Sequence, residues 1–182
     1  MCILIDNSGS MRTRRAAVKA AALALMKASQ PRDQVCIVDF NDEVFSGLPD
    51  GADFTSDIGE MEQALTHIDS RGGKAMRDAV RVSIDRLAQT APNRRKVIVL
   101  VTEGNDSAST ATQEQLLREA GNSGVPVYCI GLPGDDEPGR AGTARLALGQ
   151  LAQASGGLAF YPNDLAEVES VSHEIANRLR KP

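Results

Sequence analysis

Aromatic side chains are scarce in this 182-residue chain, which has four Phe, two Tyr and no Trp. Proteins that bind single-stranded nucleic acid stack bases on such side chains, so the composition argues against base recognition. The formal net charge of −4 points the same way, because nucleic-acid-binding domains carry an excess of Lys and Arg. We therefore expect no nucleic-acid partner.

Long apolar runs are also absent. No stretch approaches the roughly 20 apolar residues that a membrane span requires, so we expect no membrane span in this chain. The first residues, Met1–Ile5, lack the basic region of a signal peptide and lead directly into an acidic residue. Such an abrupt start is typical of a core strand, and we interpret the chain as an excerpt of a longer protein. The sequence indicates neither the compartment nor the oligomeric state.

The chain has three cysteines, Cys2, Cys36 and Cys129, and none belongs to a C-x-x-C pair or has a His at metal-ligand spacing. Each lies inside an apolar run. Free Cys is among the most buried residue types, and an odd count disfavours a complete disulfide framework. We therefore expect buried free thiols. Cys2 and Cys36 lie at similar positions in their runs, so they could be neighbours.

The composition that is present, 42% apolar and 24% charged residues, is that of a globular protein, and we expect residues 1–182 to form one domain. Short apolar runs alternate with segments of helical period. The expected strands are Met1–Ile5, Gln34–Phe40, a short edge strand within Glu43–Leu48, Lys96–Val101, Val125–Gly131 and Leu158–Tyr161.

Three of the expected helices begin with an acidic or hydroxyl side chain followed three residues later by Glu or Gln, the spacing of a capping box. The first starts at Asp57 and places Ile58, Met61, Leu65 and Ile68 on one helix face. The other two pairs are Thr112 with Gln115 and Asp164 with Glu167.

Continuous apolar strands that alternate with amphipathic helices predict an α/β fold with a mostly parallel sheet and helices on both faces, which makes three layers. Right-handed crossovers place the carboxyl ends of the parallel strands at one edge, and ligands bind there in such sheets. The loops expected at this edge are Asp6–Ser10, Asn41–Asp42, Arg71–Lys74, Glu103–Asp106 and Gly131–Glu137.

The loop Asp6-Asn7-Ser8-Gly9-Ser10 follows the first strand directly and leads into a helix. One carboxylate and two hydroxyls at alternating positions can point the same way, and ligation by oxygen alone suits a hard cation such as Mg²⁺. The alternative is an N-cap cluster that satisfies the first N–H groups of the helix. The spacing alone leaves both interpretations open.

Three segments resemble von Willebrand factor type A domains in order and spacing: ILIDNSGSM at residues 3–11, GGKAMRDA at 72–79 and VIVLVTEGND at 97–106. The segment VPVYCIGL at 125–132 resembles the fifth strand of that family. The resemblance covers essentially the whole chain. It implies a Rossmann-like sheet with one short antiparallel edge strand, no catalysis, and a Mg²⁺ or Mn²⁺ site that is completed by a carboxylate of a protein partner.

The resemblance also implies a ligand set. Asp6, Ser8 and Ser10 match the D-x-S-x-S loop of the metal-ion-dependent adhesion site. The threonine of the family falls on Lys74 and its aspartate on Glu103, so two of the five ligand positions depart from the pattern. Glu103 keeps its charge and could still act directly or through water. An ammonium at Lys74 can donate hydrogen bonds but cannot ligate a metal.

Two states follow from Lys74. In the first, its ammonium takes the place of the metal between Asp6 and Glu103, which gives a metal-independent structural or assembly domain. In the second, the flexible side chain carries the charge outward, and Asp6, Ser8, Ser10 and Glu103 bind the ion weakly. In both, the predicted partner is a protein, and the expected partner-binding rim consists of Asn7, Lys74, Asn105, Asp106 and Asp135.

An enzyme is the remaining alternative. An aspartate at the end of the first strand, such as Asp6, also begins the motif of haloacid-dehalogenase-type phosphatases, which use D-x-D with the second aspartate as general acid and base. Here Ser8 stands at the second position, so the group that transfers the proton is missing. The nucleophile-elbow pattern G-x-S-x-G and the dinucleotide pattern G-x-G-x-x-G do not follow the first strand either. We therefore expect no catalytic activity.

Overall fold

The computed structural model describes residues 1–49, 52–90, 95–134 and 138–180. Six strands form one sheet in the order β3-β2-β1-β4-β5-β6. Every neighbouring pair is parallel except β2 and β3, which run antiparallel. The predicted fold class is confirmed, including the short antiparallel strand at the edge. The strands are β1 (Cys2–Asp6), β2 (Cys36–Phe40), β3 (Val44–Ser46), β4 (Ile98–Thr102), β5 (Val127–Gly131) and β6 (Ala159–Phe160).

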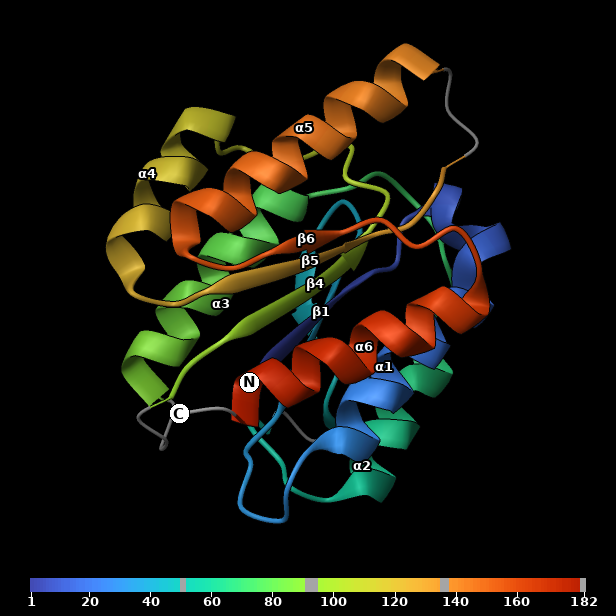
Figure 1. The fold of residues 1–182 in the computed structure, drawn as a ribbon, viewed down its shortest axis with the longest axis vertical. Helices are drawn as coiled ribbons and strands as arrows, with labels where there is room; N and C mark the ends of the chain where they lie inside the picture. The colour runs from blue at the N-terminus through green and yellow to red at the C-terminus, as the bar shows by residue number, and fades with distance from the viewer. Residues whose placement is uncertain (50–51, 91–94, 135–137, 181–182) are drawn as a thin grey trace.

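Helices cover both faces of the sheet. Figure 1 shows α1, α2 and α6 on one face and α3, α4 and α5 on the other. A 3₁₀ turn, η1 (Gly9–Arg14), links β1 to α1. The helices are α1 (Arg15–Ala28), α2 (Ile58–Ala64), α3 (Met76–Thr90), α4 (Gln113–Ser123), α5 (Pro138–Ser155) and α6 (Leu165–Arg180).

The three predicted helix starts are confirmed, and Asp57 accepts from the backbone N–H of Glu60. Thr112 accepts from the backbone of Gln115 and Gln115 reaches back to Thr112, and Asp164 accepts from the backbone of Glu167. The helix that begins after Asp57 is shorter than expected. It changes to a 3₁₀ turn at residues 65–67, and Ile68 lies beyond both, although it remains buried.

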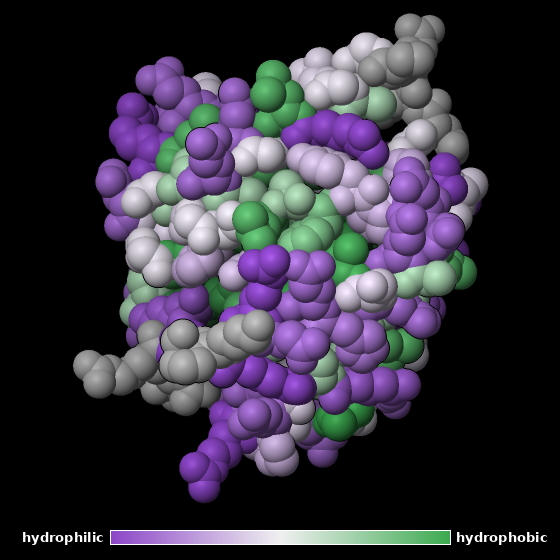
Figure 2. Space-filling model, in the orientation of Figure 1, coloured by the Kyte–Doolittle hydropathy of each residue, from purple (hydrophilic) through white to green (hydrophobic). Residues whose placement is uncertain are grey.

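Alternating side chains of the strands feed two apolar cores, one on each face of the sheet. Ile3, Ile5 and Ile37 pack towards α1, α2 and α6. Leu4 and Phe40 pack towards α3, α4 and α5. All five residues of β1, β2 and β4 are buried, which explains why these strands are continuously apolar rather than alternating. On the face drawn in Figure 2, apolar side chains gather between α5 and α6, with hydrophilic side chains around them.

Two of the three cysteines form a disulfide, so the expectation of free thiols is wrong for Cys2 and Cys36. They are direct register partners on the parallel strands β1 and β2, with their Cα atoms 4.5 Å apart. This separation lies within the range that a disulfide spans. Cys129 is buried and free as expected, and burial raises the pKa of its thiol to about 12.

No helix in the described residues is both long and apolar enough to cross a membrane.

Candidate functional site

Asp6 is the last residue of β1, and its carboxylate is completely buried at the carboxyl edge of the sheet. One oxygen, Oδ1, accepts from the hydroxyl of Ser8 at 2.6 Å and from its backbone N–H at 3.1 Å. The other, Oδ2, accepts from the hydroxyl of Thr102 at 2.5 Å and lies 3.0 Å from the ammonium of Lys74. Both oxygens therefore have partners from within the chain.

Lys74 bridges two carboxylates. Its Nζ lies 3.0 Å from Oδ2 of Asp6 and donates to Oε2 of Glu103 at 3.1 Å, and the residue is only 4% exposed. One ammonium between two carboxylates leaves a formal charge of −1 in this cluster. Charge-assisted hydrogen bonds of this kind are about twice as strong as neutral ones.

The backbone of Lys74 is fixed as firmly as its ammonium. Its N–H donates to the hydroxyl of Ser107, and its carbonyl accepts from the N–H groups of Ser107 and Ala108. These bonds attach the segment before α3 to the loop after β4. The side chain of Lys74 consequently starts from a fixed point and enters the rim between β1 and β4.

The loop after β1 is attached to the same segment through Asn7. Its side-chain oxygen accepts from the N–H of Ser70 at 2.6 Å, and its carbonyl accepts from the N–H of Arg71. Ser70 has a positive φ of 51°, a conformation that few residues other than glycine adopt, and the bond from Asn7 holds it there. Asn7 is 2% exposed, so its side chain supports the rim from inside.

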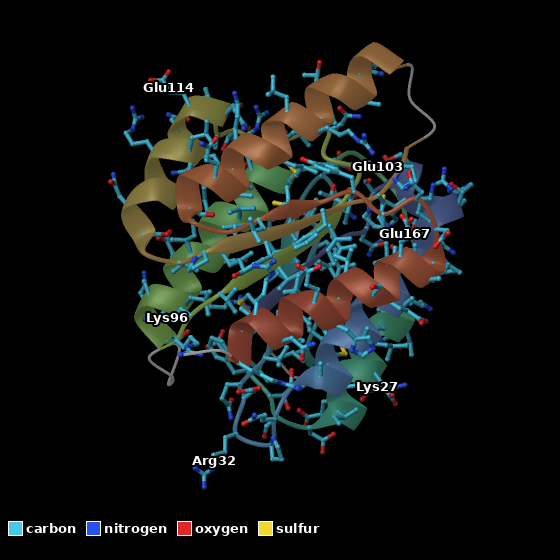
Figure 3. The ribbon with its side chains drawn as sticks, in the orientation of Figure 1. Lys27, Arg32, Lys96, Glu103, Glu114 and Glu167 are labelled. Carbon is cyan, nitrogen blue, oxygen red and sulfur yellow. A yellow bond between two sulfur atoms is a disulfide. The ribbon has the colours of Figure 1, made fainter. Side chains whose placement is uncertain are left out.

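Glu103 follows β4 directly, and the next residue explains its position. Gly104 has a φ of +91°, and a Cβ atom there would come within 2.8 Å of Leu148 on α5. Only glycine fits this turn closely against the helix. The backbone therefore bends at once after Glu103, whose carboxylate reaches Lys74. Figure 3 places Glu103 at the opposite end of the sheet from Lys96.

The loop from Asn105 to Ala111 is held by the start of α3. Asp106 accepts from the backbone N–H and the guanidinium of Arg77, at 2.8 and 2.9 Å. Asp78 accepts from the N–H groups of Thr110 and Ala111. Burial alone would raise the pKa of Asp78, but these hydrogen bonds outweigh it and hold the pKa below its ordinary value.

The predicted site residues thus have different environments. Ser10 is exposed with its hydroxyl 3.2 Å from that of Ser8, and Asn105 is half-buried. Asp135 lies outside the described residues. Within those residues, no three His, Cys, Asp or Glu side chains are placed to hold a metal ion. The structure brings Asp6, Ser8, Lys74 and Glu103 together, and Ser10 borders them.

Sequence reasoning missed Thr102, which donates the shortest hydrogen bond to Asp6. Its place before Glu103 suggested the start of a polar loop, whereas it is the last residue of β4 and is fully buried. The expected parallel pairing of β1 with β4 could have revealed it. In that pairing, a polar residue at the end of β4 lies next to Asp6 at the end of β1.

Comparisons with known proteins agree with this architecture. The family model described as von Willebrand factor type A domain matches residues 1–105. A solved structure of a von Willebrand factor type A protein from Catenulispora acidiphila has a TM-score of 0.80 and 24% identity, and covers 98% of this chain and 42% of that chain. No curated protein sequence matches the chain.

Two further structures are similar in fold. An aerotolerance-related membrane protein from Bacteroides fragilis has a TM-score of 0.74 and 17% identity, with 97% of this chain and 98% of that chain covered. The pilus adhesin SpaC from Lactobacillus rhamnosus GG has a TM-score of 0.77 and 14% identity, with 98% and 29% covered. The chain therefore spans less than half the length of two of these three proteins.

Proposed function

Since the chain belongs to the von Willebrand factor type A domain family, whose members are generally interaction modules rather than enzymes, we propose that residues 1–182 form one non-catalytic domain that binds a protein partner without a divalent metal. The partner-binding surface is the rim around Asp6, Lys74 and Glu103. The pilus adhesin among the structural relatives supports an interaction role.

The observation that carries this proposal is the ammonium of Lys74 between the carboxylates of Asp6 and Glu103. These are two of the positions at which the family pattern has metal ligands. A divalent cation ligated by the same oxygens would lie within a few ångströms of the ammonium. At an effective dielectric of 20, a single charge pair at 4 Å repels by about 4 kcal/mol and a divalent ion by about 8 kcal/mol.

Rotation of the flexible Lys74 side chain towards solvent would avoid this repulsion only at a high cost. Turning the ammonium outward would leave two buried carboxylates without their cation until a metal arrived, and unpaired buried charges are costly. The hydroxyl of Ser8 is committed to Asp6 as well. The residues therefore do not fit a resident Mg²⁺ or Mn²⁺, and Lys74 serves as the internal counter-cation.

Absence of catalysis is the second part of the proposal. A phosphatase of the haloacid-dehalogenase type would need Asp6 as a free nucleophile and a carboxylate two residues later. Ser8 occupies that position, and both oxygens of Asp6 are engaged. An attacking carboxylate would have to break its bonds to Thr102 and Lys74 first.

Without a metal, an acidic side chain of the partner meets an ammonium that is already paired with two carboxylates. Recognition then depends on the shape of the rim and on its exposed hydrogen-bonding groups. Ser10, Arg71 and Ser107 are exposed, and Asn105, two residues before Ser107, is half-buried. These come from the three loops that are bonded together beneath the surface by Asn7 and the Lys74 backbone.

Calorimetric titration of Mg²⁺ and Mn²⁺ into metal-stripped protein tests the metal-free claim. Wild type is expected to show no saturable binding at millimolar metal. Lys74→Thr restores the hydroxyl of the family pattern, so it is expected to bind the ion and to gain thermal stability with it. Lys27→Thr removes an exposed lysine from α1, far from Glu103 in Figure 3, and should behave as wild type. Saturable binding to wild type with the affinity of Lys74→Thr would overturn the proposal.

Selection of displayed peptides on the immobilised protein in the presence of a chelator tests the binding role. We expect binders whose affinity is unchanged by magnesium and is lost in Asn105→Arg. The matched control is Asn177→Arg, on an exposed position of α6. If all selected peptides require magnesium, or if none distinguishes Asn105→Arg from the control, the rim is not a metal-free binding surface.

A further inference from the structure

A further buried carboxylate, that of Asp39, lies on β2, one residue before the partner of Asp6 in the register of β1 with β2. Asp39 is paired with Ile5 of β1. Its side chain points to the same face of the sheet as that of Ile5, towards α2. It is 3% exposed. Within the described residues, its Oδ1 is buried and has no hydrogen-bond partner. Buried polar atoms without a partner are rare in proteins, and each calls for an explanation.

Asp39 lies at the base of a pocket of about 230 Å³ between β3 and the end of α2. Ala64, Gln63 and His67 form one wall, and Phe45 and Gly47 form another. Sites for drug-sized ligands have about 300–1,000 Å³, so this pocket is suited to one side chain or one small amine. A buried carboxylate at its base marks it as a cation site.

The backbone at Gly47 packs closely against the carboxylate of Asp39. A Cβ atom on Gly47 would come within 2.7 Å of Oδ2 of Asp39, and Gly47 itself lines the pocket. Asp39 and Gly47 both line the pocket, so the carboxylate borders it. Because Oδ1 is enclosed, a ligand can contact one oxygen of Asp39 from this side rather than both.

Phe45 supplies a second feature that favours a cation. It is the direct cross-strand partner of Asp39, so the two side chains project from neighbouring strands on the same face. Phe45 is 40% exposed and lines the pocket. An aromatic ring beside a carboxylate attracts a positive group through the quadrupole of the ring as well as through the charge.

We propose that this pocket binds a single alkylammonium group, as carried by a lysine side chain or a small aliphatic amine, with Asp39 as its counter-ion and Phe45 beside its methylene chain. A compact ammonium is preferred to a guanidinium because the planar fork of arginine needs two coplanar carboxylate oxygens for bidentate pairing. Oδ1 of Asp39 is enclosed, so a planar guanidinium could not reach both oxygens.

The surroundings determine how this site responds to pH. Burial, and after it the negative charge of Asp69, raises the pKa of Asp39 to about 7. Asp69 is itself paired with Arg71, and His67 faces the pocket from the other wall. Because the ligand requires ionised Asp39, its apparent affinity should be about tenfold lower at pH 6 than at pH 8 from Asp39 alone.

The test is a titration of n-butylammonium chloride into protein labelled at the aspartate carboxyl carbons, followed by NMR at pH 6 and pH 8, with sodium chloride at equal ionic strength as the control. We expect saturable shifts of the Asp39 resonance and a drop of its pKa by at least one unit, which corresponds to tenfold tighter binding to the ionised form. An Asp39 titration that is the same with and without the amine would overturn the proposal.

Variants separate the site from other acidic surfaces. Asp39→Asn is expected to abolish binding and Phe45→Leu to weaken it several-fold, while Asp85→Asn, on an exposed position of α3, should leave it unchanged. Amide spectra establish that each variant is folded. Binding that persists in Asp39→Asn overturns the proposal. Butylguanidinium that binds as tightly as butylammonium overturns the preference for an ammonium.

Two further probes identify the source of the ammonium. A short lysine-containing peptide that binds more tightly than butylammonium would support a lysine of a protein partner. Butylammonium that binds while the peptide does not would support a small free amine. Failure of both probes would contradict the proposal without bearing on the rim, because Lys74 and its partners take no part in this pocket.

Discussion

Asp6 and Asp39 are two buried carboxylates on the neighbouring strands β1 and β2, and they differ in the partners that the chain supplies. Asp6 has a lysine, a threonine and a serine as partners. Asp39 has an enclosed oxygen without a partner among the described residues and a pocket beside it. Where the chain supplies its own cation, an external one has no place. Where it supplies none, a space remains that a cation can enter.

The difference arises from the strands next to each carboxylate. Asp6 lies in the centre of the sheet, where β4 brings Thr102 and the following Glu103 to its side and the segment before α3 brings Lys74. Asp39 lies next to the three-residue edge strand β3, which offers Phe45, and to Gly47, which follows that strand. A central position therefore gives a closed network, and a position beside a short edge strand gives an open site.

The largest effect is expected from Lys74→Met, which keeps the apolar stem and removes the charge. Asp6 and Glu103 would remain buried without a cation, and breaking a buried ion pair costs about 3–5 kcal/mol. Urea unfolding measures the loss in the free energy of unfolding. Lys27→Met should change it by less than about 0.5 kcal/mol, as is usual for an exposed position. A loss below about 1 kcal/mol in Lys74→Met would mean that Asp6 is not held by an internal cation.

Asp39→Asn should raise the free energy of unfolding at neutral to alkaline pH, whereas Lys74→Met lowers it. The pKa of Asp39 is raised from 3.8 to about 7 in the folded protein, so between these values the folded state binds more protons than the unfolded state. Stability is therefore highest in acid and falls as pH rises towards 7. Above pH 7 the ionised carboxyl costs up to about 4 kcal/mol.

The variant removes this cost and should be more stable than wild type at pH 8, with a flatter dependence of unfolding free energy on pH. Asp85→Asn is the matched control. A variant that is less stable than wild type at pH 8 would show that Asp39 has an internal partner after all, and the contrast with Asp6 would disappear.

The disulfide joins the two strands that carry the two carboxylates. Cys2 and Cys36 are 34 residues apart in sequence, and closing a loop of this length stabilises a protein by about 4 kcal/mol. The double variant Cys2→Ala, Cys36→Ala should lose about this amount against oxidised wild type in urea unfolding, and much less against wild type unfolded in reductant. Equal losses against both would mean that the two thiols are not joined.

Thr102→Val is expected to have the smallest effect. It removes the hydrogen bond to Oδ2 of Asp6, but Lys74 remains as a partner of that oxygen. The loss of one hydrogen bond to a charged group should cost about 2 kcal/mol. A loss as large as that of Lys74→Met, measured under the same conditions, would assign the main support of Asp6 to the hydroxyl rather than to the ammonium.

Much of this architecture could be predicted from the sequence because it depends on local pattern. The apolar runs at β1, β2, β4 and β5 predicted strands covered on both faces, and the structure has strands there with helices on both faces. Capping residues such as Thr112 mark a helix start independently of the rest of the fold. The polar loops that start at Asp6 and at Glu103 indicated the rim because parallel strands end at one edge.

The remainder depended on which side chains meet across the sheet. Sequence could not decide whether Lys74 points inward, because that follows from the bonds that Ser107 and Ala108 make to its backbone. Asp39 lies within the otherwise apolar run of β2. Its isolation follows from the glycine and phenylalanine that β3 and its end place beside it. The pairing of Cys2 with Cys36 required the register of β1 and β2.

A crystal structure determined in magnesium-containing buffer tests the central claim, that Lys74 replaces the metal, most directly. We predict an ammonium within hydrogen-bonding distance of both Asp6 and Glu103, as at 3.0 and 3.1 Å here. Octahedral oxygen density at about 2.1 Å from a central ion, with the Lys74 side chain turned towards solvent, would contradict it.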